Sequence, residues 1–189
     1  MAYRNGTYVA FDGLDTTNPT IGDIKYFNML KMWKNINSKS LIDFKFSDSH
    51  QKTSQVRDTS SRNTLERVLL ERLKNSKNMV LILTEKTRHD REMLNYEIEK
   101  AIEMGLAIIV CYPRAQEPIL NPYYYAGYWP KALQEGIENE EAQCIHIPFK
   151  KPLVFNALSR FSTHSEEVLS SLTHYNKEAY NNHFSIKWN

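Results

Sequence analysis

The sequence predicts an α/β protein built on a parallel sheet, and three observations support this fold class. Apolar runs of strand length alternate with segments in which apolar residues recur at helical spacing. Two of the runs, residues 78–84 and 106–112, are almost entirely apolar, as expected of strands buried on both faces. The chain has 189 residues, of which 41% are hydrophobic and 24% charged, so it can bury one sizeable core. We therefore expect helices on both faces of a central sheet.

Two strands and one helix are expected before the first long polar segment. Residues 7–12 form the first strand. Asp23 can cap the helix that follows, which ends in the Asn-rich segment 35–38. Residues 41–46 form the second strand. The polar segment 47–63 then predicts a functional loop, with a simple connector as the alternative.

The alternation continues through the middle of the chain. A helix is expected over 64–74, and the strand over 78–84 follows it. A second helix over 91–104 ends at Gly105, and the strand over 106–112 comes next.

The last part of the chain completes the sheet and covers it. After a short helix near 131–135, residues 142–147 form a fifth strand, which Pro148 closes. We expect an α/β domain over 1–150 and a C-terminal helical extension over 151–189 that packs on the same domain. The spacing of its apolar residues predicts one or two covering helices, which include Val168, Leu169, Leu172 and Tyr175.

Five parallel strands joined by helices are expected in the flavodoxin-like order 2-1-3-4-5. In that order the ligand crevice lies outside the carboxyl ends of strands 1 and 3. Strand 1 ends at Asp12 and Gly13, and strand 3 ends just before Glu85. The topology therefore predicts that these residues, distant in sequence, border one crevice.

Composition excludes several classes of function. A formal net charge of +2 is too small to imply a nucleic-acid surface by itself, so we expect no nucleic-acid partner without excluding one, and no apolar run approaches the length of a membrane span. The first residues contain no apolar stretch of signal-peptide length, so we expect a cytoplasmic protein. Cys111 and Cys144 lie in apolar runs and are expected to be buried, reduced thiols.

Common cofactor and metal motifs are also missing. The six glycines form neither a GxxxxGK[ST] loop nor a GxGxxG turn, so a dinucleotide would be bound as a substrate, with no separate cofactor. The histidines lack the close spacing of a metal site, and we expect no bound metal.

Four segments in order carry a specific resemblance. They are the run from Tyr8 to Asp12, the long polar loop, residues 78–84, and Asn95-Tyr-Glu-Ile-Glu-Lys-Ala101 before an apolar strand. Over about residues 5–112 the chain resembles a TIR domain, and more narrowly the ThsB-like TIR branch of Thoeris anti-phage systems.

The resemblance implies an immune enzyme that cleaves NAD between nicotinamide and ribose. It further implies a cyclic ADP-ribose-type product that activates a separate effector, and a resting enzyme that awaits a trigger, such as a phage-derived protein. The resemblance is also compatible with an oligomeric protein. The family pattern of a catalytic Glu followed by an aliphatic residue matches Glu97-Ile98.

Two carboxylates remain equal candidates for the chemistry. Glu97 borders the apolar stripe of its helix, whereas Glu85 directly follows the third strand at the expected crevice. Either carboxylate can stabilise the positive ribose that forms when nicotinamide leaves. The structural alternative for Glu85 is that its negative charge stabilises the N-terminus of the following helix.

Substrate contacts are expected from both sides of the crevice. Phe11 and Phe46 are candidates to stack on a ring of the dinucleotide, and core packing is the alternative for both. Asp48 and His50, like Asp12 and Gly13, are candidates for ribose or phosphate contacts, with a solvated loop as the alternative.

Two other functions compete with the enzyme. A non-catalytic TIR-like module would recruit partners, and the aromatic segment 123–129 offers anchors for them, although capping the sheet edge explains it as well. A receiver-like domain shares the strand order, but Glu85 stands where its phosphoacceptor Asp is needed.

Overall fold

The computed structural model describes residues 4–15, 18, 22–36, 45–48, 62–184, 186 and 188, with the backbone alone for 45–48 and 183. Within these ranges the chain forms a parallel six-stranded sheet in the order β2-β1-β3-β4-β5-β6. The predicted order 2-1-3-4-5 is confirmed, and a short strand is added beside β5. The strands are β1 (Gly6–Phe11), β2 (Lys45–Asp48), β3 (Ser76–Ile82), β4 (Ala107–Tyr112), β5 (Cys144–Pro148) and β6 (Thr173–His174).

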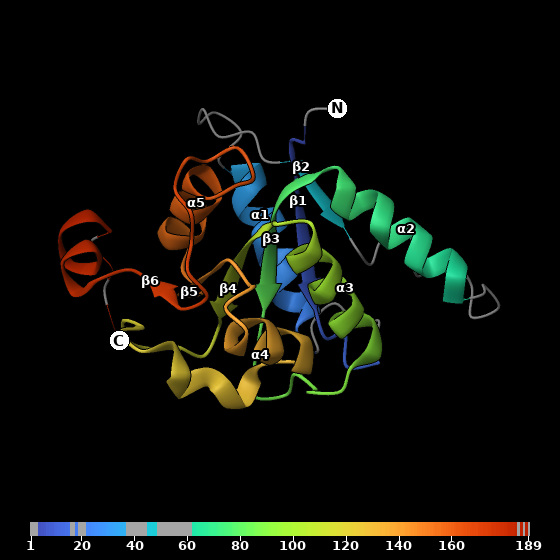
Figure 1. The fold of residues 1–189 in the computed structure, drawn as a ribbon. Helices are drawn as coiled ribbons and strands as arrows, with labels where there is room; N and C mark the ends of the chain where they lie inside the picture. Colours follow the sequence, from blue (N-terminus) through green and yellow to red (C-terminus); the bar gives the residue numbers. More distant parts are fainter. Residues whose placement is uncertain are drawn as a thin grey trace.

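Helices cover both faces of this sheet (Figure 1). The helices are α1 (Ile24–Ile36), α2 (Arg62–Lys74), α3 (Glu92–Glu103), α4 (Lys131–Glu138) and α5 (Lys151–Arg160), with short turns η1 (Pro122–Tyr128) and η2 (Ala179–His183). Alternate residues of β1 divide the core: Tyr8 packs with α2, α3 and α4, whereas Val9 packs with α1 and α5. The three-layer fold predicted from sequence follows from this alternation.

Asn78 of β3 ties the sheet to the end of α5. Its Oδ1 accepts a hydrogen bond from Thr7 Oγ1 at 2.7 Å. Its Nδ2 donates to the carbonyl oxygens of Leu158 and Phe161 at 3.3 and 2.9 Å. All of these groups are buried, so the amide satisfies polar atoms that no solvent can reach.

A buried hydrogen-bond chain joins β4, β5 and the segment before β6. Trp129 Nε1 donates to Tyr112 Oη at 2.8 Å, and that hydroxyl lies 2.8 Å from His146 Nδ1. His146 Nε2 lies 3.1 Å from the Ser171 carbonyl, which can only accept. The imidazole is therefore neutral with its proton on Nε2, in agreement with burial, which lowers the pKa of His146 to about 4.

Both cysteines are buried, as the sequence predicts. Cys111 lies in the core cluster beneath α1 and α5, and Cys144 lies in the cluster on the opposite face of the sheet. Burial raises the pKa of both thiols.

The C-terminal part forms one of the one or two expected helices, but the apolar residues assigned to them, from Val168 to Tyr175, lie outside it. It supplies α5, but residues after Arg160 form turns and the strand β6, and the side chain of Val168 is exposed. Serine and threonine hydroxyls bind nearby backbone groups here, for example Ser165 with the N–H of Glu167. Such local bonds compete with helix formation. Among the residues that the structure covers, no helix is long and apolar enough to cross a membrane.

We predict that Asn78→Ala lowers the free energy of unfolding by about 3 kcal/mol, because it leaves buried carbonyl groups without a donor. Asn75→Ala is the matched control, since Asn75 also donates its amide to a backbone carbonyl but is exposed. Urea-induced unfolding measures the free energy of unfolding of both variants and of the wild type. Equal losses in the two variants would contradict the role given to Asn78.

Candidate active site

Asp12 follows β1 and is buried at the carboxyl edge of the sheet. Arg88 Nη2 donates to its Oδ1 at 2.7 Å, and Arg88 Nε donates to its Oδ2 at 2.7 Å. The backbone N–H groups of Leu14 and Arg88 add bonds of 2.9 and 3.1 Å. Burial by itself raises the pKa of Asp12, but these hydrogen bonds, led by that of Arg88, outweigh it and lower the pKa. An ion pair between the buried Asp12 and the partly exposed Arg88 thus fastens the segment after β3 to the end of β1.

Asp15 lies at the surface above this pair. Arg88 Nη1 donates to its Oδ2 at 2.5 Å, and Arg91 Nη2 lies 3.1 Å from its Oδ1. The hydrogen bond from Arg88 and the charge of Arg91 lower the pKa of Asp15. Leu14 and Asp15 both have left-handed backbone angles, with φ of 50° and 53°.

The start of α3 borders a hollow that is open to solvent and has a volume of about 480 Å³. We call it the arginine hollow, and its lining residues are Arg88, His89, Asp90, Arg91 and Glu92. Its acids have partners already: His89 Nδ1 lies 3.0 Å from Asp90, and Arg62 pairs with Glu92. The volume lies within the range of small-molecule sites.

Glu97 lies one to two turns further along α3 and is buried against the sheet. Tyr8 Oη donates to its Oε1 at 2.9 Å. Burial raises the pKa of Glu97 to about 8, against the lowering effects of the Tyr8 bond and of the charges on Arg72 and Arg91. A buried carboxyl group with a strongly raised pKa is typical of a functional site.

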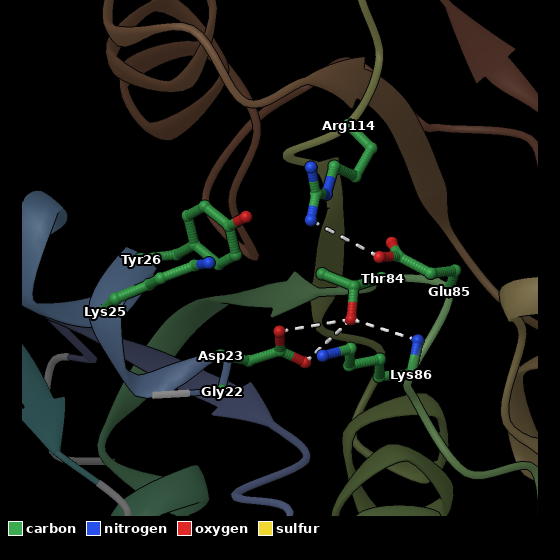
Figure 2. Close-up of a pocket in the computed structure, with 8 residues that line it drawn as sticks. All are labelled: Gly22, Asp23, Lys25, Tyr26, Thr84, Glu85, Lys86 and Arg114. Carbon is green, nitrogen blue, oxygen red and sulfur yellow. Dashed lines mark hydrogen bonds and ion pairs between the residues drawn. The ribbon is translucent and has the colours of Figure 1, made fainter. Parts of the chain in front are cut away.

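Glu85 borders a second and much smaller cavity, which Figure 2 shows. This edge pocket has a volume of about 30 Å³, room for little more than a water molecule. Its lining residues are Gly22, Asp23, Lys25, Tyr26, Thr84, Glu85, Lys86 and Arg114. The Glu85 side chain is partly exposed, and its Oε1 lies 3.5 Å from Arg114 Nη2.

Asp23 and Thr84 form the buried wall of the edge pocket (Figure 2). Thr84 Oγ1 accepts from the Lys86 N–H at 3.3 Å and donates to both oxygens of Asp23 at 3.1 Å. Burial raises the pKa of Asp23 to about 6, and the charges of Asp12 and Glu85 act in the same direction.

The structure brings only some of the predicted site residues together. Asp12 and Glu85 lie at one edge of the sheet, close enough for both to act on Asp23. Glu97 lines neither the arginine hollow nor the edge pocket. Its side chain lies between α3 and the sheet, where it contacts Tyr8. Gly13 follows Asp12 and is partly exposed.

The predicted aromatic and loop contacts have different outcomes. Phe11 is buried and stacks on Phe27 with 5.8 Å between ring centroids, so its ring faces the core. The side chains of Phe46 and Asp48 lie outside the described structure, as does all of His50. Their substrate contacts stay predictions.

Sequence reasoning missed the ion-pair network. The charged run from Arg88 to Arg91 is visible in the sequence and suggests a merely solvated segment, yet Arg88 binds an acid 76 positions away. Asp23 was expected only as a helix cap. Only the meeting of β1 and β3 in the sheet reveals these partners.

Among the described positions, no group of three His, Cys, Asp or Glu side chains is arranged to hold a metal ion. A family model described as "Thoeris protein ThsB, TIR-like domain" matches residues 8–118. The matched segment runs from β1 through β4 and contains both Glu85 and Glu97.

We predict that Glu97→Gln gains stability relative to the wild type as pH rises. Glu97 has a folded pKa of about 8 and an ordinary value of 4.5, so the unfolded chain ionises first. The neutral form of Glu97 contributes its full stabilisation to the folded wild type below pH 4.5. This contribution falls progressively up to pH 8, and by pH 7 the free energy of unfolding has lost about 3 kcal/mol. Glutamine stays neutral throughout.

Thermal unfolding from pH 5 to pH 8 measures this effect. Glu103→Gln is the control, because Glu103 lies on the same helix but is exposed and paired with Lys100. If the Glu97→Gln and wild-type curves ran parallel across the range, the shifted pKa would be refuted.

Proposed function

The chain belongs to the TIR-like domain family of the Thoeris protein ThsB, and on that premise we propose that it cleaves NAD between nicotinamide and ribose. We propose further that the product is a cyclic ADP-ribose-type signal for a separate effector. The observation that carries this proposal is the carboxyl group of Glu97, with its raised pKa, on the helix that borders the arginine hollow.

The proposed chemistry needs one carboxylate near the ribose. When the bond breaks, its electron pair goes to the ring nitrogen and nicotinamide leaves as a neutral molecule, so no acid is required. The ribose carbon becomes positive, and the Glu97 carboxylate stabilises it. The positive nicotinamide ring of bound NAD favours the ionised form of Glu97. A nucleophile from the same dinucleotide then closes the ring, where water would give hydrolysis.

Cavity size argues against Glu85 as the carboxylate, whereas Glu97 lies on the helix whose start borders the larger hollow, although it does not line that hollow. The edge pocket beside Glu85 has a volume of about 30 Å³, against about 480 Å³ for the arginine hollow. A nicotinamide ribose group exceeds the smaller volume many times over. Glu85 is also engaged by Arg114.

The burial of Glu97 fits an enzyme that rests until it is triggered. Its side chain is covered and its carboxyl group is bound by Tyr8. Activation on this account opens access to Glu97 from the arginine hollow.

A non-catalytic interaction module is the second candidate, and one observation favours it. Leu120, Tyr123 and Tyr124 are exposed together at η1, with 85% of Tyr124 accessible. Exposed tyrosines are good anchors for a protein partner.

We predict that Glu97→Gln reduces nicotinamide release from NAD by at least about 100-fold, the usual loss when one charge-stabilising group is removed. Glu103→Gln should match the wild type. Mass spectrometry of the nucleotide products, with and without lysate from infected cells, measures release.

The same assay with Glu85→Gln separates the two carboxylates. Loss of activity in Glu85→Gln with activity retained in Glu97→Gln would transfer the chemistry to Glu85. A folded wild type that releases no nicotinamide in any condition would leave the interaction module as the function.

We also predict that kcat/KM for nicotinamide release rises from pH 6 to pH 8, because Glu97 must ionise and its pKa is about 8. Tyr8→Phe should move this rise to higher pH, since the Tyr8 hydrogen bond lowers the pKa of Glu97. A rise centred near pH 4.5 in both proteins would contradict the assignment.

A further inference from the structure

Two guanidinium groups converge on one exposed carboxylate at the arginine hollow. Arg88 Nη1 and Arg91 Nη2 each contact a different oxygen of Asp15, at 2.5 and 3.1 Å. The Asp15 side chain is 60% exposed, and the two arginine side chains are about 40% exposed. The bridge therefore lies at the surface, where a ligand in the hollow can reach it.

Arg88 is held rigidly for this contact. Asp12 binds its Nε and Nη2 from the buried side, which leaves Nη1 directed to the outside. A guanidinium group fixed in this way loses little conformational freedom when it binds an anion.

Asp15 is a weakly held partner by comparison. An exposed ion pair contributes little to stability. The loop that presents it also places Leu14 and Asp15 in left-handed conformations that non-glycine residues avoid. The acids nearby, Asp90 and Glu92, have their own partners in His89 and Arg62 and do not occupy these arginines.

We propose that Arg88 and Arg91 form a diphosphate-binding site, which Asp15 occupies in the free protein and leaves when a dinucleotide binds. The identity of the ligand rests on the proposed function. A diphosphate carries more charge than one carboxylate and offers several oxygens for bidentate contacts, so it displaces Asp15.

The position of the site along α3 sets its distance from Glu97. Arg91 precedes Glu97 by six residues, about 9 Å along the helix axis. This separation is on the scale of a ribose 5′-phosphate. Glu97 also lies about 120° from Arg91 around the helix and does not line the hollow, so the nicotinamide ribose reaches it only after the opening that the proposed function requires.

Calorimetric titration of the full chain with ADP-ribose tests the site, because this probe carries the diphosphate but no bond for the enzyme to cleave. Asp15→Asn should bind ADP-ribose about threefold more tightly, because it removes the competitor. Arg91→Gln should bind about tenfold more weakly. Asp15→Gly removes the carboxylate and suits the left-handed backbone, so it serves if the Asn variant is unstable.

Three comparisons make the result specific. Glu167→Gln, which breaks an exposed pair with Arg160 far along the chain, should leave the affinity unchanged. The affinities of the variants for inorganic pyrophosphate should follow the same order as those for ADP-ribose. Adenosine, which has no diphosphate, should bind to all of them equally.

Two results would overturn the inference: a wild type that does not bind ADP-ribose, or Asp15 and Arg91 variants that bind it as the wild type does. Neither depends on turnover. If these affinities change as expected while NAD yields no nicotinamide, the diphosphate site stands and the proposed enzyme activity fails.

Discussion

The ion pair between the buried Asp12 and the partly exposed Arg88 is the constraint on which the carboxyl edge of the sheet depends. It joins the end of β1 to the segment that leads into α3, across 76 positions of sequence. Removing the Arg88 guanidinium leaves the buried Asp12 carboxylate without its charged partner, which destabilises the fold by about 3 kcal/mol. Because this pair anchors the segment just before α3, it helps to position Arg91 at the start of that helix.

Two buried carboxyl groups, those of Asp12 and Glu97, have opposite electrostatic environments. Asp12 has several hydrogen-bond donors and a lowered pKa, whereas Glu97 has Tyr8 and a pKa of about 8. Such divergence separates a carboxylate that holds structure from one that can change its protonation state during a reaction. The arrangement assigns Asp12 to the framework and makes Glu97 the better candidate for chemistry.

The arrangement of the strands could be predicted because each buried strand is a short apolar run bounded by polar or glycine residues, as at 78–84 and 106–112. β6 could not, because a strand of two residues carries no periodicity. The strand order predicted that Asp12 and Glu85 border one crevice. They follow the neighbouring strands β1 and β3 at one edge of the sheet, but only Glu85 lines the edge pocket. The strand order could not reveal the partner of Arg88, since a charged residue in a polar segment gives no sign of a distant acid. Phe11 shows a related limit, because at a strand end only the packing of α1 decides that the ring faces Phe27.

A crystal structure of Glu97→Gln with NAD bound tests the central claim most directly. The account predicts a diphosphate in contact with Arg88 and Arg91, Asp15 moved away from both, and the nicotinamide ribose facing the side chain at position 97. A dinucleotide bound instead beside Glu85 in the edge pocket, with the bridge to Asp15 intact, would contradict it.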